Sequence, residues 1–212
     1  MERSMNTEHL QLVSNIAHWI EGGIFGAVAM IALLQVLGYG KSGLLAYLWQ
    51  TLILLAGLFL PFYLLLQQGF GQIDESWAFI IGDRQQREHL VMSLLLILIG
   101  AVEILIVAGL LRSNGWRFAA PTALVLIGII LMVHTEYGTA QAVSQSVTQH
   151  RYQGGIVILV GLFKAAEVVW ARRFKWLAFI WIFLLFGAAA LLISYREPEG
   201  AYKTEADIME VS

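Results

Sequence analysis

The sequence contains no cysteine and few charged residues. Only 13% of its 212 residues are Asp, Glu, Lys or Arg, about half the share found in a soluble domain. Without cysteine the chain can form no disulfide, thiolate metal site, iron–sulfur cluster or c-type haem linkage. Any metal site must therefore use His, carboxylate, Met or backbone oxygen ligands. The net charge of −2 is too small to indicate a nucleic-acid partner.

Common catalytic motifs are absent as well. The sequence has no G-x-S-x-G, Walker A or H-E-x-x-H pattern, which argues against a hydrolase or an ATPase. The polar N-terminal segment lacks the basic region of a signal peptide, so the apolar stretch after it is predicted to be a retained first helix.

Long apolar runs make up most of the chain. Hydrophobic residues account for 58% of the sequence, and the mean hydropathy is +0.72. These values predict an all-α, polytopic membrane helix bundle of about six transmembrane helices, forming a single domain over residues 1–212. The predicted spans are about 15–37, 44–66, 89–111, 118–133, 152–170 and 176–194, followed by an acidic tail over 195–212.

Six spans place both termini on the same side of the membrane. The loops after the first, third and fifth spans are short and basic, and they carry Lys41, Arg112, Arg117, Arg172, Arg173 and Lys175. Orientation follows the density of Lys and Arg in short loops. We therefore expect these loops in the cytoplasm and both termini on the extracytoplasmic side.

Four of the five histidines are predicted to lie near that outer face. His18, His89 and His150 are each 22 or 23 residues from the basic residue at the far end of their helix, and for His134 this separation is 17 residues. At 1.5 Å per residue the separations correspond to about 25–35 Å. The four histidines thus fall near one interface on four different helices, whereas His9 precedes the first helix.

Convergent imidazoles predict a metal or haem site. Neutral imidazole is a common ligand of zinc, copper and iron, and two imidazoles could equally be the axial ligands of a b-type haem. Glu21 and Glu136 lie close to His18 and His134 in the sequence, so they are predicted as further ligands or as acceptors that orient a ring. The alternative is that the histidines are merely interfacial.

The pattern H-x-x-[E/Q]-G-G-I occurs twice, starting at His18 and at His150. Paired glycines allow a close approach between helices or to a flat cofactor. The repeat therefore indicates either a unit of a built site or ordinary helix packing.

Charged residues also occur inside the predicted spans. Glu103 and Lys164 each lie 14 residues past the histidine of their own helix, which places both about 21 Å below the histidines. Because charges inside a membrane usually pair, the sequence predicts a Glu103–Lys164 ion pair with Glu167 one turn further along. This pair would support a proton or cation step, or only lock two helices together.

Several stretches resemble the copper-resistance D-type (CopD-like) membrane proteins. They are AHWIEGG, REHLVMSLLLILIGAVE, and LMVHTEYGTAQA followed by QHRYQGGIVILVGL. The resemblance implies copper handling at a bacterial inner membrane, with His18, His89, His134 and His150 at the matching positions. It covers about half of the chain, in short histidine and glycine patterns.

Three functional hypotheses follow from the sequence. The first is a membrane protein that binds a transition metal, with copper favoured over zinc, and sequesters or passes on the ion rather than catalysing turnover. The second is a b-haem subunit of a respiratory or oxidoreductase complex. The third is an accessory subunit without a cofactor. The expected partners are membrane lipid and either other membrane subunits or a periplasmic metal or electron carrier.

Overall fold

The computed structural model describes residues 7–40, 42–68 and 73–202, and every regular element within these ranges is helical. In chain order the elements are α1 (Thr7–Val36), η1 (Gly43–Tyr47), α2 (Leu48–Gln68), α3 (Ile73–Gly82), α4 (Arg84–Val107), η2 (Asn114–Phe118), α5 (Ala119–Met132), α6 (Ala140–Trp170) and α7 (Leu177–Ser194). The predicted all-α fold is confirmed. Lys41 and residues 203–212 of the predicted acidic tail lie outside the described residues.

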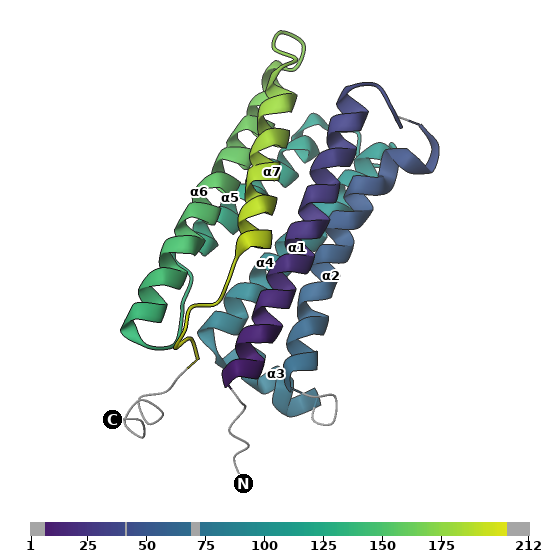
Figure 1. The fold of residues 1–212 in the computed structure, drawn as a ribbon. Helices are drawn as coiled ribbons and strands as arrows, with labels where there is room; N and C mark the ends of the chain where they lie inside the picture. The colour runs from purple at the N-terminus through teal and green to yellow at the C-terminus, as the bar shows by residue number, and fades with distance from the viewer. Residues whose placement is uncertain (1–6, 41, 69–72, 203–212) are drawn as a thin grey trace, which may run out of the picture.

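Six helical segments are long and apolar enough to cross a membrane. They are α1, η1 with α2, α4, η2 with α5, α6 and α7, and they contain 18 to 31 residues each. Even the shortest covers about 27 Å at 1.5 Å per residue, close to the thickness of the hydrocarbon layer. This confirms the predicted number of spans. The remaining helix, α3, has 10 residues and lies at one end of the bundle (Figure 1).

The six spans run alternately in opposite directions, so α1 begins and α7 ends at the same end of the bundle (Figure 1). Neighbouring spans pack as α5 on α6, α2 on α4 and α1 on α7, and α6 also packs on α7. Val28, Ile99, Val160 and Ile182 lie in the shared core and are almost completely buried.

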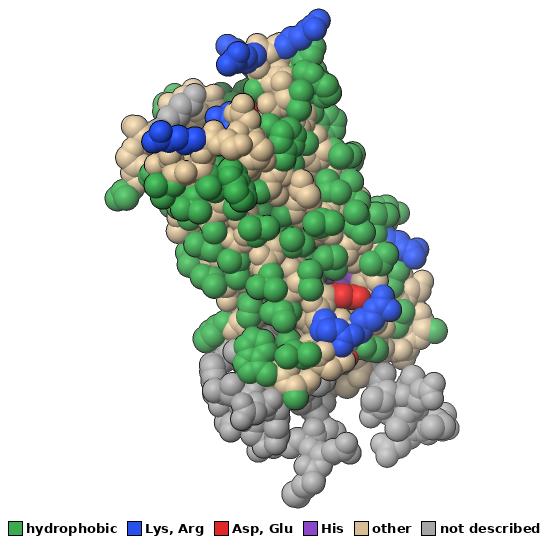
Figure 2. Space-filling view, turned by 180° about the vertical axis from the view of Figure 1, so that it is seen from behind, with side chains coloured by type: hydrophobic (Ala, Val, Ile, Leu, Met, Phe, Trp, Pro, Cys, Tyr) green, Lys and Arg blue, Asp and Glu red, His purple; other side chains and the backbone are tan. Residues whose placement is uncertain are grey.

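The outer surface of the bundle is apolar around its middle. Leu55, Leu94, Leu126 and Phe183 are large apolar side chains that are 44% to 61% exposed. Figure 2 shows apolar side chains over the middle of one face and Lys and Arg side chains at its two ends. A belt of this kind is stable in contact with lipid and unfavourable in water.

Three helices begin earlier than predicted, and one of them is α4, which starts at Arg84 and not near residue 89. α6 starts at Ala140 and not near residue 152, and α1 starts at Thr7 and not near residue 15. The reason is that hydropathy marks where the apolar segment begins, whereas a helix begins at its cap. For α6 the Ala142 N–H donates to Thr139 Oγ1 at 3.2 Å. His150 and His9 consequently lie within helices and not before them.

In both copies of the repeat, the first glycine of the pair lies against a neighbouring helix and the second does not. A Cβ added at Gly22 would lie 2.9 Å from a backbone oxygen of α7, and one added at Gly154 would lie 2.6 Å from a backbone oxygen of α5. Gly23 and Gly155 have nothing within 4 Å of an added Cβ. The first glycine of each pair therefore permits close helix packing, and the second does not.

We predict that Gly22→Ala and Gly154→Ala each lower the free energy of unfolding by about 1–3 kcal/mol, because the added methyl group forces packed helices apart. Gly23→Ala and Gly155→Ala are the matched controls and should be neutral or slightly stabilising, since Ala favours the helix. Unfolding of the detergent-solubilised protein, followed by circular dichroism, measures the difference. Equal effects within each pair would contradict this assignment.

Candidate metal centre

Four histidines converge at the end of the bundle where α1 begins. His18 comes from α1, His89 from α4, His150 from α6, and His134 from the connection between α5 and α6. Their ring centroids form a chain, with 6.0 Å from His18 to His150, 4.9 Å from His150 to His134, and 4.7 Å from His134 to His89. The structure thus brings together the four histidines singled out in the sequence, and His9 is exposed on α1.

The three helical histidines make the same local contact. Nδ1 of His18, His89 and His150 lies 2.8, 2.8 and 3.0 Å from the backbone oxygen four residues earlier in its own helix. A backbone oxygen can only accept, so each Nδ1 donates its proton there. Nε2 of each neutral ring therefore carries a lone pair. Metal-binding histidines are commonly oriented in this way, by a carbonyl group that accepts from the other ring nitrogen.

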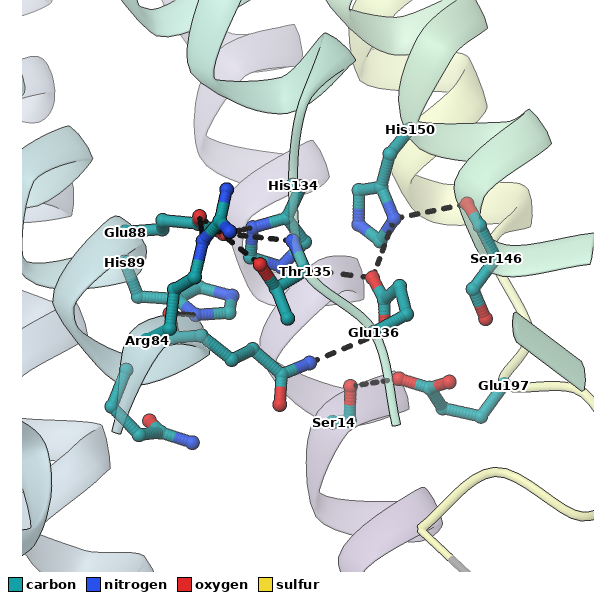
Figure 3. Close-up of polar contacts among 12 residues, drawn as sticks. Ser14, Arg84, Glu88, His89, His134, Thr135, Glu136, Ser146, His150 and Glu197 are labelled. Carbon is teal, nitrogen blue, oxygen red and sulfur yellow. Dashed lines mark hydrogen bonds and ion pairs between the residues drawn. The ribbon is translucent and has the colours of Figure 1, made fainter. Parts of the chain in front are cut away.

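His134 lies between two carboxylates (Figure 3). Its Nδ1 is 2.9 Å from Glu88 Oε2, and its Nε2 is 3.6 Å from Glu136 Oε1. Burial lowers the pKa of His134, and the neighbouring His89 and His150 lower it further, so the ring is neutral near pH 7. Whichever nitrogen holds the proton, the other has a lone pair beside a carboxylate oxygen.

His134, Glu136 and His150 form the group of described residues whose geometry could hold a metal ion. One ligand atom from each lies within 4.8 Å of the others, and the three side chains are 1%, 5% and 4% exposed. Ligand atoms bound to one ion at about 2.1 Å lie about 3–4 Å apart. A small side-chain movement would therefore bring all three onto a single ion.

Unsatisfied polar atoms mark the same place. His134 Nδ1 and Glu136 Oε1 are buried and have no hydrogen-bond partner of suitable geometry. Glu136 Oε1 is 2.8 Å from His150 Nδ1, but the proton of that nitrogen is directed to the Ser146 backbone oxygen. Buried polar atoms without partners are costly. Because His134 Nδ1 faces Glu88 and Nε2 is the ring nitrogen near Glu136, a bound cation would satisfy Glu136 Oε1, so the residues present fit a metal ion.

The connection that carries His134 and Glu136 is anchored to the start of α4 (Figure 3). The backbone N–H and the hydroxyl of Thr135 donate to Glu88 at 2.8 and 3.2 Å. Arg84 pairs with the same carboxylate at 2.9 Å, and Gln85 Nε2 donates to Glu136 Oε2 at 3.2 Å. These bonds hold a non-helical segment in a fixed position beside the helical histidines.

The segment after α7 covers the histidines. The ring of Tyr195 stacks on His18 with 4.0 Å between centroids. Glu197 Oε1 accepts hydrogen bonds from Ser14 Oγ at 2.6 Å and from the Tyr202 hydroxyl at 3.0 Å. The segment therefore connects α1 to the cluster and limits the access of water to it.

Glu21 lies apart from the ion-binding group. It lines a cavity inside the bundle together with Gln153, which occupies the same position in the second copy of the repeat. His18, His89 and His150 line this cavity as well. Glu21 is thus placed below the histidines and faces the bundle interior.

The structure does not pair Glu103 with Lys164. Among the ion pairs of the described residues, none joins these two side chains. The Lys164 ammonium lies over the rings of Trp181 and Trp49, 4.4 and 5.2 Å from their centroids. Glu167 accepts a hydrogen bond from Trp181 Nε1 at 2.7 Å. Aromatic faces thus replace the predicted acidic partner of Lys164.

Sequence reasoning missed several residues of the site: Arg84, Gln85, Glu88, Ser146, Tyr195 and Glu197. Glu88 could have been found, because an acidic residue beside a histidine at the start of a span is a metal-site signal. Tyr195 and Glu197 carried no such signal, since only tertiary structure folds the segment after α7 over the cluster.

No protein-family model, curated protein sequence or solved structure matches this chain. The functional conclusion therefore rests on the geometry of the site.

The buried carboxyl group of Glu197 predicts how the stability of the folded protein changes with pH. Burial raises the pKa of its carboxyl group above the ordinary value of 4.5, although the Ser14 and Tyr202 hydrogen bonds oppose the shift. A raised pKa in the folded state means that ionisation costs stability, so the cost is absent below about pH 4.5 and grows as the pH rises toward the folded-state value.

We therefore expect Glu197→Gln to stabilise the protein relative to wild type at pH 8 and not at pH 4.5. Glu199→Gln is the control, because Glu199 is exposed on the same segment. Thermal unfolding midpoints across this pH range measure the effect. A difference between Glu197→Gln and wild type that does not change with pH would show that ionisation of Glu197 has no such cost.

Proposed function

We propose that this chain is an integral membrane protein that holds a transition-metal ion at His134, Glu136 and His150. The observation that supports this best is the convergence of three buried ligand side chains, two of which contain atoms without hydrogen-bond partners. His18 and His89 stand beside the group, each with a lone pair on Nε2, and are the further ligands we propose.

Copper is the metal we favour. Imidazole nitrogen with carboxylate oxygen suits Cu(II) and Zn(II), and copper binds such sites more tightly than zinc does. The resemblance to CopD-like proteins points in the same direction. We place the site at the extracytoplasmic face of a bacterial inner membrane, on the basis of the short basic loops at the opposite end.

The interior of the bundle favours holding the ion over conducting it. Below the histidines the cavity walls are mainly apolar, and Lys164 lies at the far end. A metal cation that moved inward would leave its ligands and approach a positive charge. We therefore propose that the ion is stored at one face or exchanged there with a periplasmic carrier, rather than passed through the bundle.

A b-type haem is a second candidate, supported by the same cavity. His18, His89 and His150 line it beside apolar side chains. An apolar slot with imidazole nitrogens at one end is the environment in which axial histidines hold a haem. The two candidates differ in the residues used, because His134 and Glu136 do not line the cavity and the haem would not need them.

Metal content tests both candidates. We expect the detergent-purified protein, dialysed against Cu(II) or Zn(II) and analysed by plasma mass spectrometry, to hold roughly one ion per chain. His134→Ala and His150→Ala should lose it, and Glu88→Gln should weaken binding by about 10–100-fold, because an oriented ligand loses its support. His9→Ala is the matched control, since this histidine is exposed and distant from the group.

Iron in equal amount to the chain, with a Soret band that His134→Ala leaves intact, would favour the haem. A protein that binds no metal and no haem would overturn both candidates and leave a subunit without a cofactor.

A further inference from the structure

Two cavities inside the bundle share part of their lining. The first is the mainly apolar cavity below the histidines, which is lined by His18, His89 and His150 and by Lys164. The second lies toward the opposite end and is lined in part by Gln35, Gln50 and Glu167. Both cavities are lined by Lys164 and by the two tryptophans that flank it. We call the second cavity the polar vestibule.

The linings of the two cavities differ in polarity. Gln35, Gln50, Lys164 and Glu167 line the vestibule beside apolar side chains, whereas the walls of the cavity below the histidines are mainly apolar. Lys164 lies 14 residues after His150 on α6, so the two ends of the apolar cavity are about 21 Å apart along the helix axis. A single extended long acyl chain matches this length.

Lys164 supplies a charge for a headgroup. Its ammonium contacts only aromatic rings among the partners found for it in the described residues. Glu167, one turn away, directs its carboxylate to Trp181 Nε1 at 2.7 Å. A lysine at membrane depth is costly unless it has an anionic partner or water. An anion at the junction of the two cavities would supply that partner.

We propose that the apolar cavity binds one long-chain carboxylate, with its carboxylate at Lys164 and its alkyl chain directed toward the histidines. The site is separate from the metal group, because none of its headgroup contacts is a proposed metal ligand. Binding should therefore occur in metal-depleted protein as well as in the protein as purified.

Tryptophan fluorescence provides the test. Palmitate brominated next to its carboxyl group should quench the emission of the full-length, delipidated protein in a saturable manner, because the bromine would lie beside Trp49 and Trp181. The isomer brominated at the methyl end should bind equally well and quench less. Unlabelled palmitate should displace the probe, and hexadecanol, which has the same chain without the charge, should displace it poorly.

Variants of Lys164 identify the headgroup site. We expect Lys164→Met to weaken binding about tenfold or more, since a partly desolvated charge pair is lost, and Lys164→Arg to retain most of the affinity. Lys175→Met is the matched control, because Lys175 is exposed in the turn between α6 and α7. Size-exclusion chromatography verifies that each variant is folded.

Four outcomes would overturn the proposal. They are an absence of palmitate binding, quenching that does not saturate, equal competition by hexadecanol, and equal loss of affinity in Lys164→Met and Lys175→Met. Loss of metal binding in His134→Ala with palmitate binding unchanged would support two separate sites. A protein that binds metal but no palmitate would overturn this inference alone.

Discussion

The structure depends on a single constraint, namely that hydrocarbon offers no partner for a backbone N–H or carbonyl group. Each span must therefore satisfy its own backbone bonds as a helix, and polar chemistry is confined to the ends of the spans and to the bundle interior. The site obeys this rule. His134 and Glu136 lie on the connection between α5 and α6 at one end of the bundle, where a non-helical segment can be satisfied by side chains of α4.

The same backbone also fixes the chemistry of the histidines. In a helix the carbonyl group of residue i−4 lies within reach of a histidine Nδ1, and His18, His89 and His150 all use it. The bond determines which nitrogen carries the proton and keeps Nε2 available as a ligand. His134 has no helical carbonyl of this kind, and the carboxylates of Glu88 and Glu136 flank its ring instead. The cluster thus combines three histidines whose tautomer is fixed with one, His134, whose proton can lie on either ring nitrogen.

The two ends of the bundle interior differ in charge, and this difference separates the two proposed ligands. Imidazoles and carboxylates at the histidine end suit a cation, whereas Lys164 at the junction with the polar vestibule suits an anion. The cavity walls between them are mainly apolar, so neither ion gains by moving toward the other end. An alkyl chain is the kind of group that such a connecting cavity accommodates. The metal-binding and carboxylate-binding proposals therefore concern opposite ends of one cavity.

The sequence by itself determined the class of the fold, the six spans and the common depth of the four histidines, because hydropathy and a rise of 1.5 Å per residue act along the chain. Depth along a helix does not specify direction around it, so only the tertiary structure decided which side chains meet. It placed His134, Glu136 and His150 together and left Glu21 facing the cavity. It also placed Lys164 against Trp49 and Trp181, although the equal depth of Glu103 had predicted an ion pair. Helix starts differed where capping by Thr139, and not hydropathy, sets the boundary. The physical reason is that spacing along one helix is a local property, whereas contacts between helices depend on how all six pack.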